Sequence, residues 1–165
     1  MFAAAFHGLE YLTSAVMMKF LFDYARSASC KTELFGFDAE QIYGNVTLYV
    51  IPMVNPDGID IAINGLDLQN KYHKYLYDTL GTLDYSHIWQ ANARGVDLNH
   101  NYDALWKPIT SGAAPGKYGG RFPESEPETQ AIVNLVKEID FSMVIALHSQ
   151  GEEIYYDFNN EIPSG

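Results

Sequence analysis

The stretch FSMVIALH, residues 141–148, is a short apolar run that ends at a histidine, and FAAAFH, residues 2–7, repeats this design near the start of the chain. Both runs have the length of a β-strand. In an open α/β sheet, ligands bind in the crevice outside the carboxyl ends of the strands. We therefore expect His7 and His148 to meet at one edge of a sheet, with Glu10 close to the first histidine.

The segments between these two runs predict an α/β domain. A helix is expected from Glu10 to about Arg26, and because apolar residues cover most of its circumference, it should be buried on all sides. A central strand is expected over residues 45–51, which are rich in β-branched and aromatic side chains. Ser125 and Glu128 form a capping box before a helix with an apolar stripe. Strands that alternate with helices are typical of α/β folds.

Some other polar residues are expected to have structural roles. The sequence from Asn55 to Gly58, NPDG, predicts a turn. Asp97 is expected to hold neighbouring loops through hydrogen bonds. His73 and His87 lie in polar contexts without partners at metal-ligand spacing, so we expect both at the surface.

Composition limits the class of protein and its partners. The 165 residues, 47% of them hydrophobic, suffice for one domain with a core. The formal charge of -11 argues against a nucleic acid or an anionic membrane as partner. We find no signal peptide and no membrane-spanning run, so we expect a soluble chain, and its location stays open. A single cysteine, Cys30, excludes an internal disulfide framework.

The strongest chemical signal is a candidate metal site. His7 and Glu10 stand three residues apart in an H-x-x-E pattern, so they point the same way if the segment turns helical. Together with His148 they would form a His₂Glu set that leaves a fourth position for water, as catalytic zinc requires. H-x-x-E alone is common by chance. However, a buried histidine at the end of an apolar strand is costly without a partner.

Five short motifs span nearly the whole chain: residues 7–10 (HGLE), 55–58 (NPDG), 92–99 (NARGVDLN), 125–129 (SEPET) and 147–151 (LHSQG). Their order is similar to that in the zinc carboxypeptidase (M14-type) family. The third motif, at residues 92–99, is similar to that of bacterial members that cut γ-D-glutamyl-diamino acid bonds in cell-wall peptides.

The resemblance implies a fold, a cofactor and a reaction. The fold would be a three-layer α/β/α domain with a mixed central sheet. Zinc would be held by His7, Glu10 and His148, and would activate water against a peptide or a peptidoglycan peptide. An arginine would stabilise the oxyanion. Arg94 is the candidate, although a surface ion pair explains it equally well, and several relatives carry that arginine at the position of Gln90.

One departure from the family concerns substrate recognition. Many family carboxypeptidases have Asn-Arg where this chain has Asn99 and His100, and their arginine binds the terminal carboxylate of the substrate. Histidine cannot form the same two-pronged contact. Asn99 and His100 are expected to bind substrate, but ordinary C-terminal carboxypeptidase specificity is in doubt. The alternative is that His100 simply faces solvent.

A second departure is the absence of the family's general-base glutamate, which follows the last zinc histidine at a distance. Glu152, Glu153 and Glu161 are not in its context. We therefore expect residues 1–165 to form a single partial domain, incomplete at both ends and weakly active or inactive alone. Its exposed sheet edges would favour self-association.

Two alternatives are also compatible with the sequence. The first is a non-catalytic fragment that binds metal and peptide. The second is a related zinc deacylase of N-acyl amino acids, against which the segments at 55–58 and 125–128 favour the peptidase branch.

Overall fold

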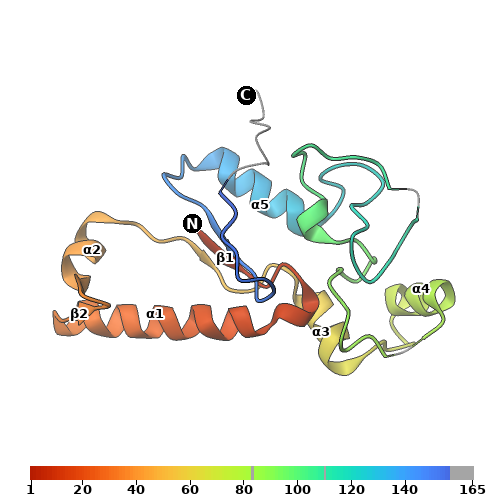
Figure 1. The fold of residues 1–165 in the computed structure, drawn as a ribbon, viewed down its shortest axis with the longest axis horizontal. Helices are drawn as coiled ribbons and strands as arrows, with labels where there is room; N and C mark the ends of the chain where they lie inside the picture. The colour runs from red at the N-terminus through yellow and green to blue at the C-terminus, as the bar shows by residue number, and fades with distance from the viewer. Residues whose placement is uncertain (83, 110, 157–165) are drawn as a thin grey trace.

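A three-stranded parallel sheet lies at the centre of the computed structural model, which describes residues 1–82, 84–109 and 111–156 (Figure 1). The strand order is β4 (Val50–Ile51), β1 (Phe2–Ala4), β5 (Ile145–Leu147). In this register Phe2 lies beside both Val50 and Ile145. The two runs that end at histidines are therefore neighbouring strands that point the same way.

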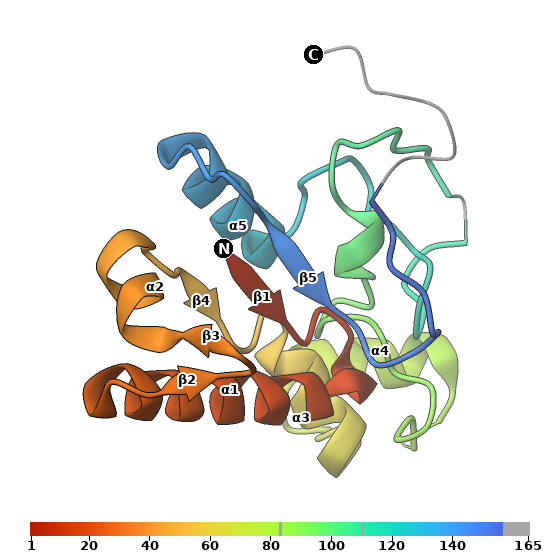
Figure 2. The ribbon, with the colours of Figure 1, turned by 60° about the vertical axis from the view of Figure 1, so that its left-hand side comes forward.

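Helices lie on both sides of this sheet, as the predicted α/β class requires. Figures 1 and 2 show α1 below the sheet and α5 above it. Two apolar clusters form the core, one of them around Phe6, Leu98 and Ile132, and the other around Trp89 and Leu76. The remaining elements are η1 (Gly8–Glu10), α1 (Leu12–Cys30), β2 (Glu33–Leu34), β3 (Phe37–Asp38), α2 (Ala39–Asn45), α3 (Pro56–Asn64), α4 (Lys71–Leu80), η2 (Leu98–His100) and α5 (Pro127–Glu138).

The α/β class is confirmed, and parallel and antiparallel strand pairs belong to separate sheets among the described residues. The three described strands of the central sheet are all parallel. The antiparallel pairing belongs to a separate ribbon formed by β2 and β3. The predicted strand over residues 45–51 pairs only at Val50 and Ile51, because its neighbour β1 is only three residues long.

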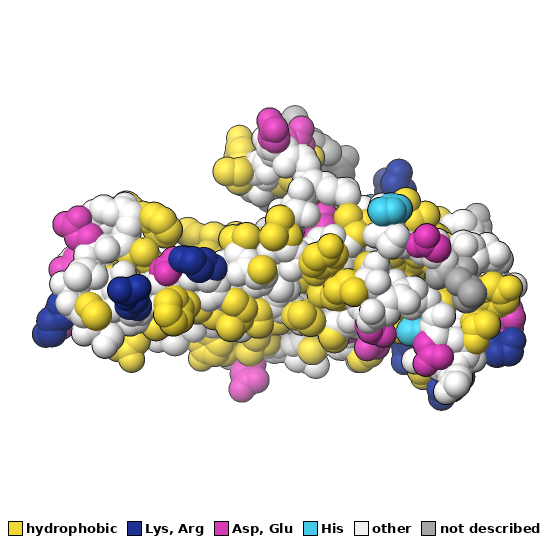
Figure 3. Space-filling view, turned by 90° about the horizontal axis from the view of Figure 1, so that it is seen from below, with side chains coloured by type: hydrophobic (Ala, Val, Ile, Leu, Met, Phe, Trp, Pro, Cys, Tyr) yellow, Lys and Arg dark blue, Asp and Glu magenta, His cyan; other side chains and the backbone are white. Residues whose placement is uncertain are grey.

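The prediction that the first helix is buried on all sides is wrong. Met17 and Tyr24 are buried, whereas Leu12, Val16 and Phe22 are more than half exposed. A helix that packs on one face of a sheet buries one stripe, and no described segment covers the opposite side of α1. Figure 3, seen from the side on which α1 lies, shows hydrophobic side chains along this face.

Two local predictions fail because proline sets the helix start. The NPDG segment does not form an isolated turn: Asn55 caps α3, and its side chain accepts a 2.9 Å hydrogen bond from the Gly58 N–H. Pro127 likewise occupies the first turn of α5, so the cap is Glu126, which makes no side-chain capping bond. The predicted capping box at Ser125 is therefore absent.

Of the two surface predictions for His73 and His87, one is confirmed and one is wrong. His87 is exposed, as expected. His73 is buried, contrary to the prediction, and its Nδ1 accepts a 3.1 Å hydrogen bond from the backbone N–H of Asp67. This bond to the backbone explains how a histidine in a polar sequence context can be buried. None of the described helices has the length and hydropathy needed to cross a bilayer.

Candidate metal centre

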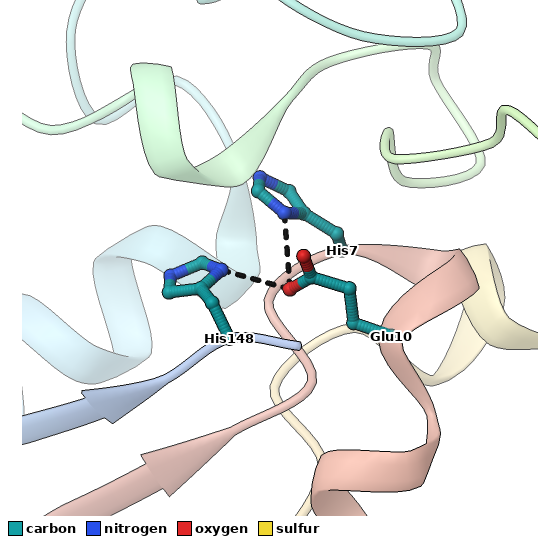
Figure 4. Close-up of side chains that lie close together, drawn as sticks. All are labelled: His7, Glu10 and His148. Atoms are coloured by element: carbon teal, nitrogen blue, oxygen red, sulfur yellow. Dashed lines mark hydrogen bonds and ion pairs between the residues drawn. The ribbon is translucent and has the colours of Figure 1, made fainter. Parts of the chain in front are cut away.

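The sheet brings the ends of β1 and β5 together and so places the candidate ligands. His148 follows β5 directly, and His7 lies three residues after β1. The turn of η1 then carries Glu10 back toward His7, as Figure 4 shows. One ligand atom from each of the three residues lies within 4.8 Å of the others. The predicted convergence of His7, Glu10 and His148 is thus present in the structure.

The loop that carries His7 and Glu10 is held by backbone contacts. The N–H groups of Gly8 and Leu9 donate to the carbonyl oxygens of Gln90 and Trp89, at 3.2 and 2.8 Å. The buried Asn55 side chain donates a 3.0 Å bond to the Phe6 carbonyl. A Cβ atom at Gly8 would collide with the carbonyl of Gly58, which leaves room only for glycine. The loop is therefore fixed before any ligand binds.

The three side chains face one another across a single carboxylate oxygen. Oε2 of Glu10 lies 2.8 Å from Nδ1 of His148 and 3.1 Å from Nδ1 of His7. Glu10 and His7 are buried, whereas 26% of the His148 side chain is exposed. The centre is thus open to solvent on the side of His148.

Opposite charges within this cluster shift the pKa values of His7 and Glu10. Burial lowers the pKa of His7, but the attraction of the nearby carboxylates of Asp97 and Glu10 outweighs it and raises the pKa to about 9. Burial raises the pKa of Glu10, but the hydrogen bond with His148 and the attraction of His7 outweigh it and lower the pKa to about 2. The Glu10 carboxylate therefore carries a negative charge over the whole physiological pH range.

Asp97 is a member of this cluster that the sequence analysis missed. Its Oδ1 lies 3.3 Å from Nε2 of His7, on the opposite side of the ring from Glu10. Its carboxylate also accepts backbone hydrogen bonds from Asn99 and Lys117, so the predicted role in holding loops is confirmed. A carboxylate between two apolar residues, Val96 and Leu98, indicates burial and hence a need for a partner, which was the available signal.

The chemistry of this cluster fits a zinc ion. Two imidazole nitrogens and one carboxylate oxygen form a ligand set used by catalytic zinc. Both ring nitrogens of His7 are buried and make no hydrogen bond of good geometry, although each faces a carboxylate oxygen. Metal-bound histidines typically have such a carboxylate behind the ring, which is the position of Asp97. The cation itself would supply the partner that Nδ1 of His7 lacks.

Arg94 does not join this cluster. Its guanidinium lies 3.6 Å from Oε2 of Glu126 and over the ring of Tyr72, and no contact among the described residues connects it to the three candidate ligands. Gln90, the alternative position for an oxyanion-binding residue, contacts the ligand loop through its backbone, since its carbonyl accepts from the N–H of Gly8. The role of Arg94 in stabilising the oxyanion stays a prediction.

Asn99 and His100 line a hollow of about 520 Å³ that Trp106 and Lys107 also border. Nε2 of His100 lies 3.8 Å from Oδ2 of Asp97, so this hollow is joined to the centre through one carboxylate. His100 is half exposed, which leaves it accessible to a substrate. Substrate binding by these residues stays a prediction.

The glutamates that follow His148 do not enter the cluster. Glu152 and Glu153 are exposed. Glu161 lies outside the described residues. Among the described residues, the only carboxylates recorded in contact with the candidate ligands are those of Glu10 and Asp97.

Comparison with known proteins gives one consistent family. The family model described as zinc carboxypeptidase matches residues 1–164. The chain is 36% identical to γ-D-glutamyl-L-diamino acid endopeptidase 1 of Lysinibacillus sphaericus, over 98% of this chain and 42% of the relative. It is 24% identical to mast cell carboxypeptidase A of Rattus norvegicus, over 94% and 35% of the two chains.

Solved structures agree on the fold. Thrombin-activatable fibrinolysis inhibitor superposes with a TM-score of 0.64 at 20% identity, over 91% of this chain and 35% of that one. The chain thus spans less than half the length of the relatives it matches.

Proposed function

The chain belongs to the zinc carboxypeptidase family, and on that premise we propose that it hydrolyses a peptide amide bond at the centre formed by His7, Glu10 and His148. The observation that carries this proposal is the convergence of the three side chains from distant parts of the sequence. Zinc is the cofactor that the family implies, and the ligand set fits it. When bound, it would supply a Lewis acid and lower the pKa of a coordinated water.

The residues of the chain would have separate roles around that ion. His7, Glu10 and His148 would hold it. Asp97 would keep the ring of His7 in orientation by accepting from Nε2. The exposed side of His148 is where a substrate amide would approach.

We further propose that the substrate is a cell-wall peptide with a γ-D-glutamyl bond. The Lysinibacillus sphaericus relative, which is similar over 98% of this chain, is a γ-D-glutamyl-L-diamino acid endopeptidase. Asn99 and His100 would bind polar groups of that peptide in the hollow beside Asp97. Histidine at position 100 is a weaker carboxylate partner than arginine, which fits an enzyme that does not depend on a free C-terminus.

We propose that none of the described residues supplies the general base. Glu10 and Asp97 both face histidines, and neither is free to accept a proton from water. A missing base typically lowers the rate by about 10²- to 10⁴-fold. We therefore propose that this chain alone has low activity, which also keeps open a non-catalytic role in binding metal and peptide.

Hydrolysis assays test this function. The zinc-loaded chain and a version extended at both ends would be incubated with the peptide L-Ala-γ-D-Glu-L-Lys and with an ordinary C-terminal dipeptide substrate. We expect zinc-dependent cleavage of the γ-D-glutamyl bond, much faster in the extended version, and none in Glu10→Gln. If neither version cleaves either substrate while holding zinc, the peptidase proposal is wrong. Equal rates for both versions would show that the described chain already contains the base.

We also propose that the sheet edges mediate self-association. Within the described residues, β4 and β5 are each paired on one side only. Met143 and Val144, which precede β5, and Ile145, its first residue, are exposed. Unpaired, apolar strand edges add further strands readily. Light scattering should show concentration-dependent oligomers that Val144→Lys reduces, and a monomer at high concentration would contradict the proposal.

A further inference from the structure

Two of the chain's three arginines, Arg94 and Arg121, line the same hollow. This hollow has a volume of about 560 Å³ and lies between α4 and the loop that precedes α5. We call it the arginine pocket. In a chain with a formal charge of -11, such a concentration of guanidinium groups indicates a local preference for anions.

Aromatic side chains form much of the rest of the arginine pocket. Tyr72 and Tyr75 extend from α4, and Tyr118 lies on the opposite loop. The guanidinium of Arg94 lies 5.8 Å from the centre of the Tyr72 ring, which orients it. Tyrosine hydroxyls can donate hydrogen bonds to an anion, and their rings can contact the apolar part of a peptide.

Among the described residues, one cation of the pocket has no ion-pair partner. Glu126 is buried and accepts 2.8 and 2.9 Å hydrogen bonds from Asn92 and Ser125, with Arg94 at 3.6 Å. Arg121 is exposed and makes no ion pair with any residue in the described part of the chain. The guanidinium of Arg121 could therefore form bidentate hydrogen bonds with an anion in the pocket.

The arginine pocket is connected to the metal centre through adjacent residues. Val96 lines the pocket, and the next residue, Asp97, faces His7. The backbone N–H of Asp97 donates a 2.8 Å bond to the carbonyl of Tyr118, another residue of the pocket. A ligand in the pocket and a substrate at the metal centre would thus be positioned by one continuous segment.

We propose that the arginine pocket is a binding subsite for a carboxylate of the peptide substrate outside the amide bond that is cleaved. This inference rests on the proposed function and adds the feature of the substrate that is recognised. Arg121 would bind the carboxylate directly, and Arg94, held by Glu126 and Tyr72, would complete the positive charge of the site.

Binding to the zinc-depleted protein tests the subsite separately from hydrolysis. The probe is acetyl-L-Ala-γ-D-Glu-L-Lys-D-Ala, compared by titration calorimetry with two analogues, one amidated at the D-Glu α-carboxyl and one at the C-terminus. We expect one of the amidated analogues to bind at least about tenfold more weakly than the parent, because it lacks one charge-assisted contact. Equal binding of all three peptides would overturn the proposal.

The variants use the three arginines as a matched set. Arg121→Gln should lower the affinity for the parent peptide by the same factor of about ten. This variant should then bind the parent peptide and the amidated analogue equally well. Arg121→Lys should recover part of the affinity, since lysine keeps the positive charge but cannot make the bidentate contact of a guanidinium. Arg26→Gln, on the exposed face of α1, makes the same change in charge away from the pocket and should bind like the parent protein.

Two further readouts separate this subsite from folding and from the metal centre. Circular dichroism melting should be unchanged in Arg121→Gln, because Arg121 has no described ion pair to lose. Zinc content should also be unchanged. If Arg121→Gln binds the parent peptide as tightly as the unmodified protein does, the subsite does not exist, whatever the outcome of the hydrolysis assays.

Discussion

Nδ1 of His148 lies 2.8 Å from Oε2 of Glu10, although 138 residues separate the two in sequence. The contact follows from the parallel pairing of β5 with β1, which places Leu147 beside Ala4 and sets both chain segments at one edge of the sheet. The metal centre is therefore a product of strand register as much as of the residues that line it.

The first prediction concerns the ligands. Replacing His7, Glu10 or His148 with Ala should lower zinc affinity by more than the roughly 10- to 100-fold that follows loss of an outer-shell partner. The check is zinc content by mass spectrometry after dialysis against a weak chelator. His87→Ala removes an exposed histidine and serves as the matched control. Full zinc occupancy in all three variants would remove the basis for this centre.

The second prediction concerns Asp97. Asp97→Asn removes the charge that faces His7 and keeps only one of the two oxygens that accept from the backbone N–H groups of Asn99 and Lys117, so one of those bonds is also lost. Zinc affinity should fall by about 10- to 100-fold with all three ligands still present. Competition with a fluorescent chelator measures this. Asp140→Asn, at an exposed position, is the control, and equal affinity in the two variants would limit Asp97 to holding loops.

The third prediction concerns pH. The pKa of His7 rises from 6.5 to about 9 on folding, so its contribution to the stability of zinc-free protein is complete below pH 6.5 and is lost as pH rises through 9. The pKa of Glu10 falls from 4.5 to about 2, so its contribution is complete above pH 4.5 and is lost toward pH 2. Stability should therefore be greatest between about pH 4.5 and 6.5.

Urea unfolding of the zinc-depleted protein across pH 3 to 10 tests this profile. His7→Gln should remove most of the loss on the alkaline side, because the residue whose pKa is raised is then absent. An alkaline limb of the same size in His7→Gln would assign the loss to other groups.

The fourth prediction concerns the backbone beneath the centre. Gly8→Ala places a Cβ against the carbonyl of Gly58, and the surrounding backbone hydrogen bonds prevent an easy shift. Overpacking of this kind costs about 1–3 kcal/mol. We expect a lower free energy of unfolding together with weaker zinc binding. Gly44→Ala, which meets no atom within 4 Å, should be neutral or stabilising, and a similar loss in both variants would contradict the steric argument.

Sequence alone predicts the parts of this fold that depend on local pattern. Two short apolar runs ending at His7 and His148 indicate strands, and the carboxyl-edge rule for α/β sheets then brings their ends together. The periodic stripe before Ile139 likewise predicts α5. These features are encoded within a few residues of one another.

The failures depend on contacts between distant segments. The exposure of Leu12 and Phe22 depends on what covers α1, which the helix's own sequence does not specify. The contact of Asp97 with His7 and that of Arg94 with Glu126 each join segments with no fixed spacing. Composition can show that a buried carboxylate needs a partner, but only the fold decides which one it meets.

The long separation between Glu10 and His148 also affects the order of events when the chain is made. His7 and Glu10 are synthesised before His148, and the third side chain joins them only after β5 has been synthesised and has docked beside β1. An ion held by all three would act as a cross-link between early and late parts of the chain. Binding of the ion by all three residues would therefore require that β5 has been synthesised and has paired with β1.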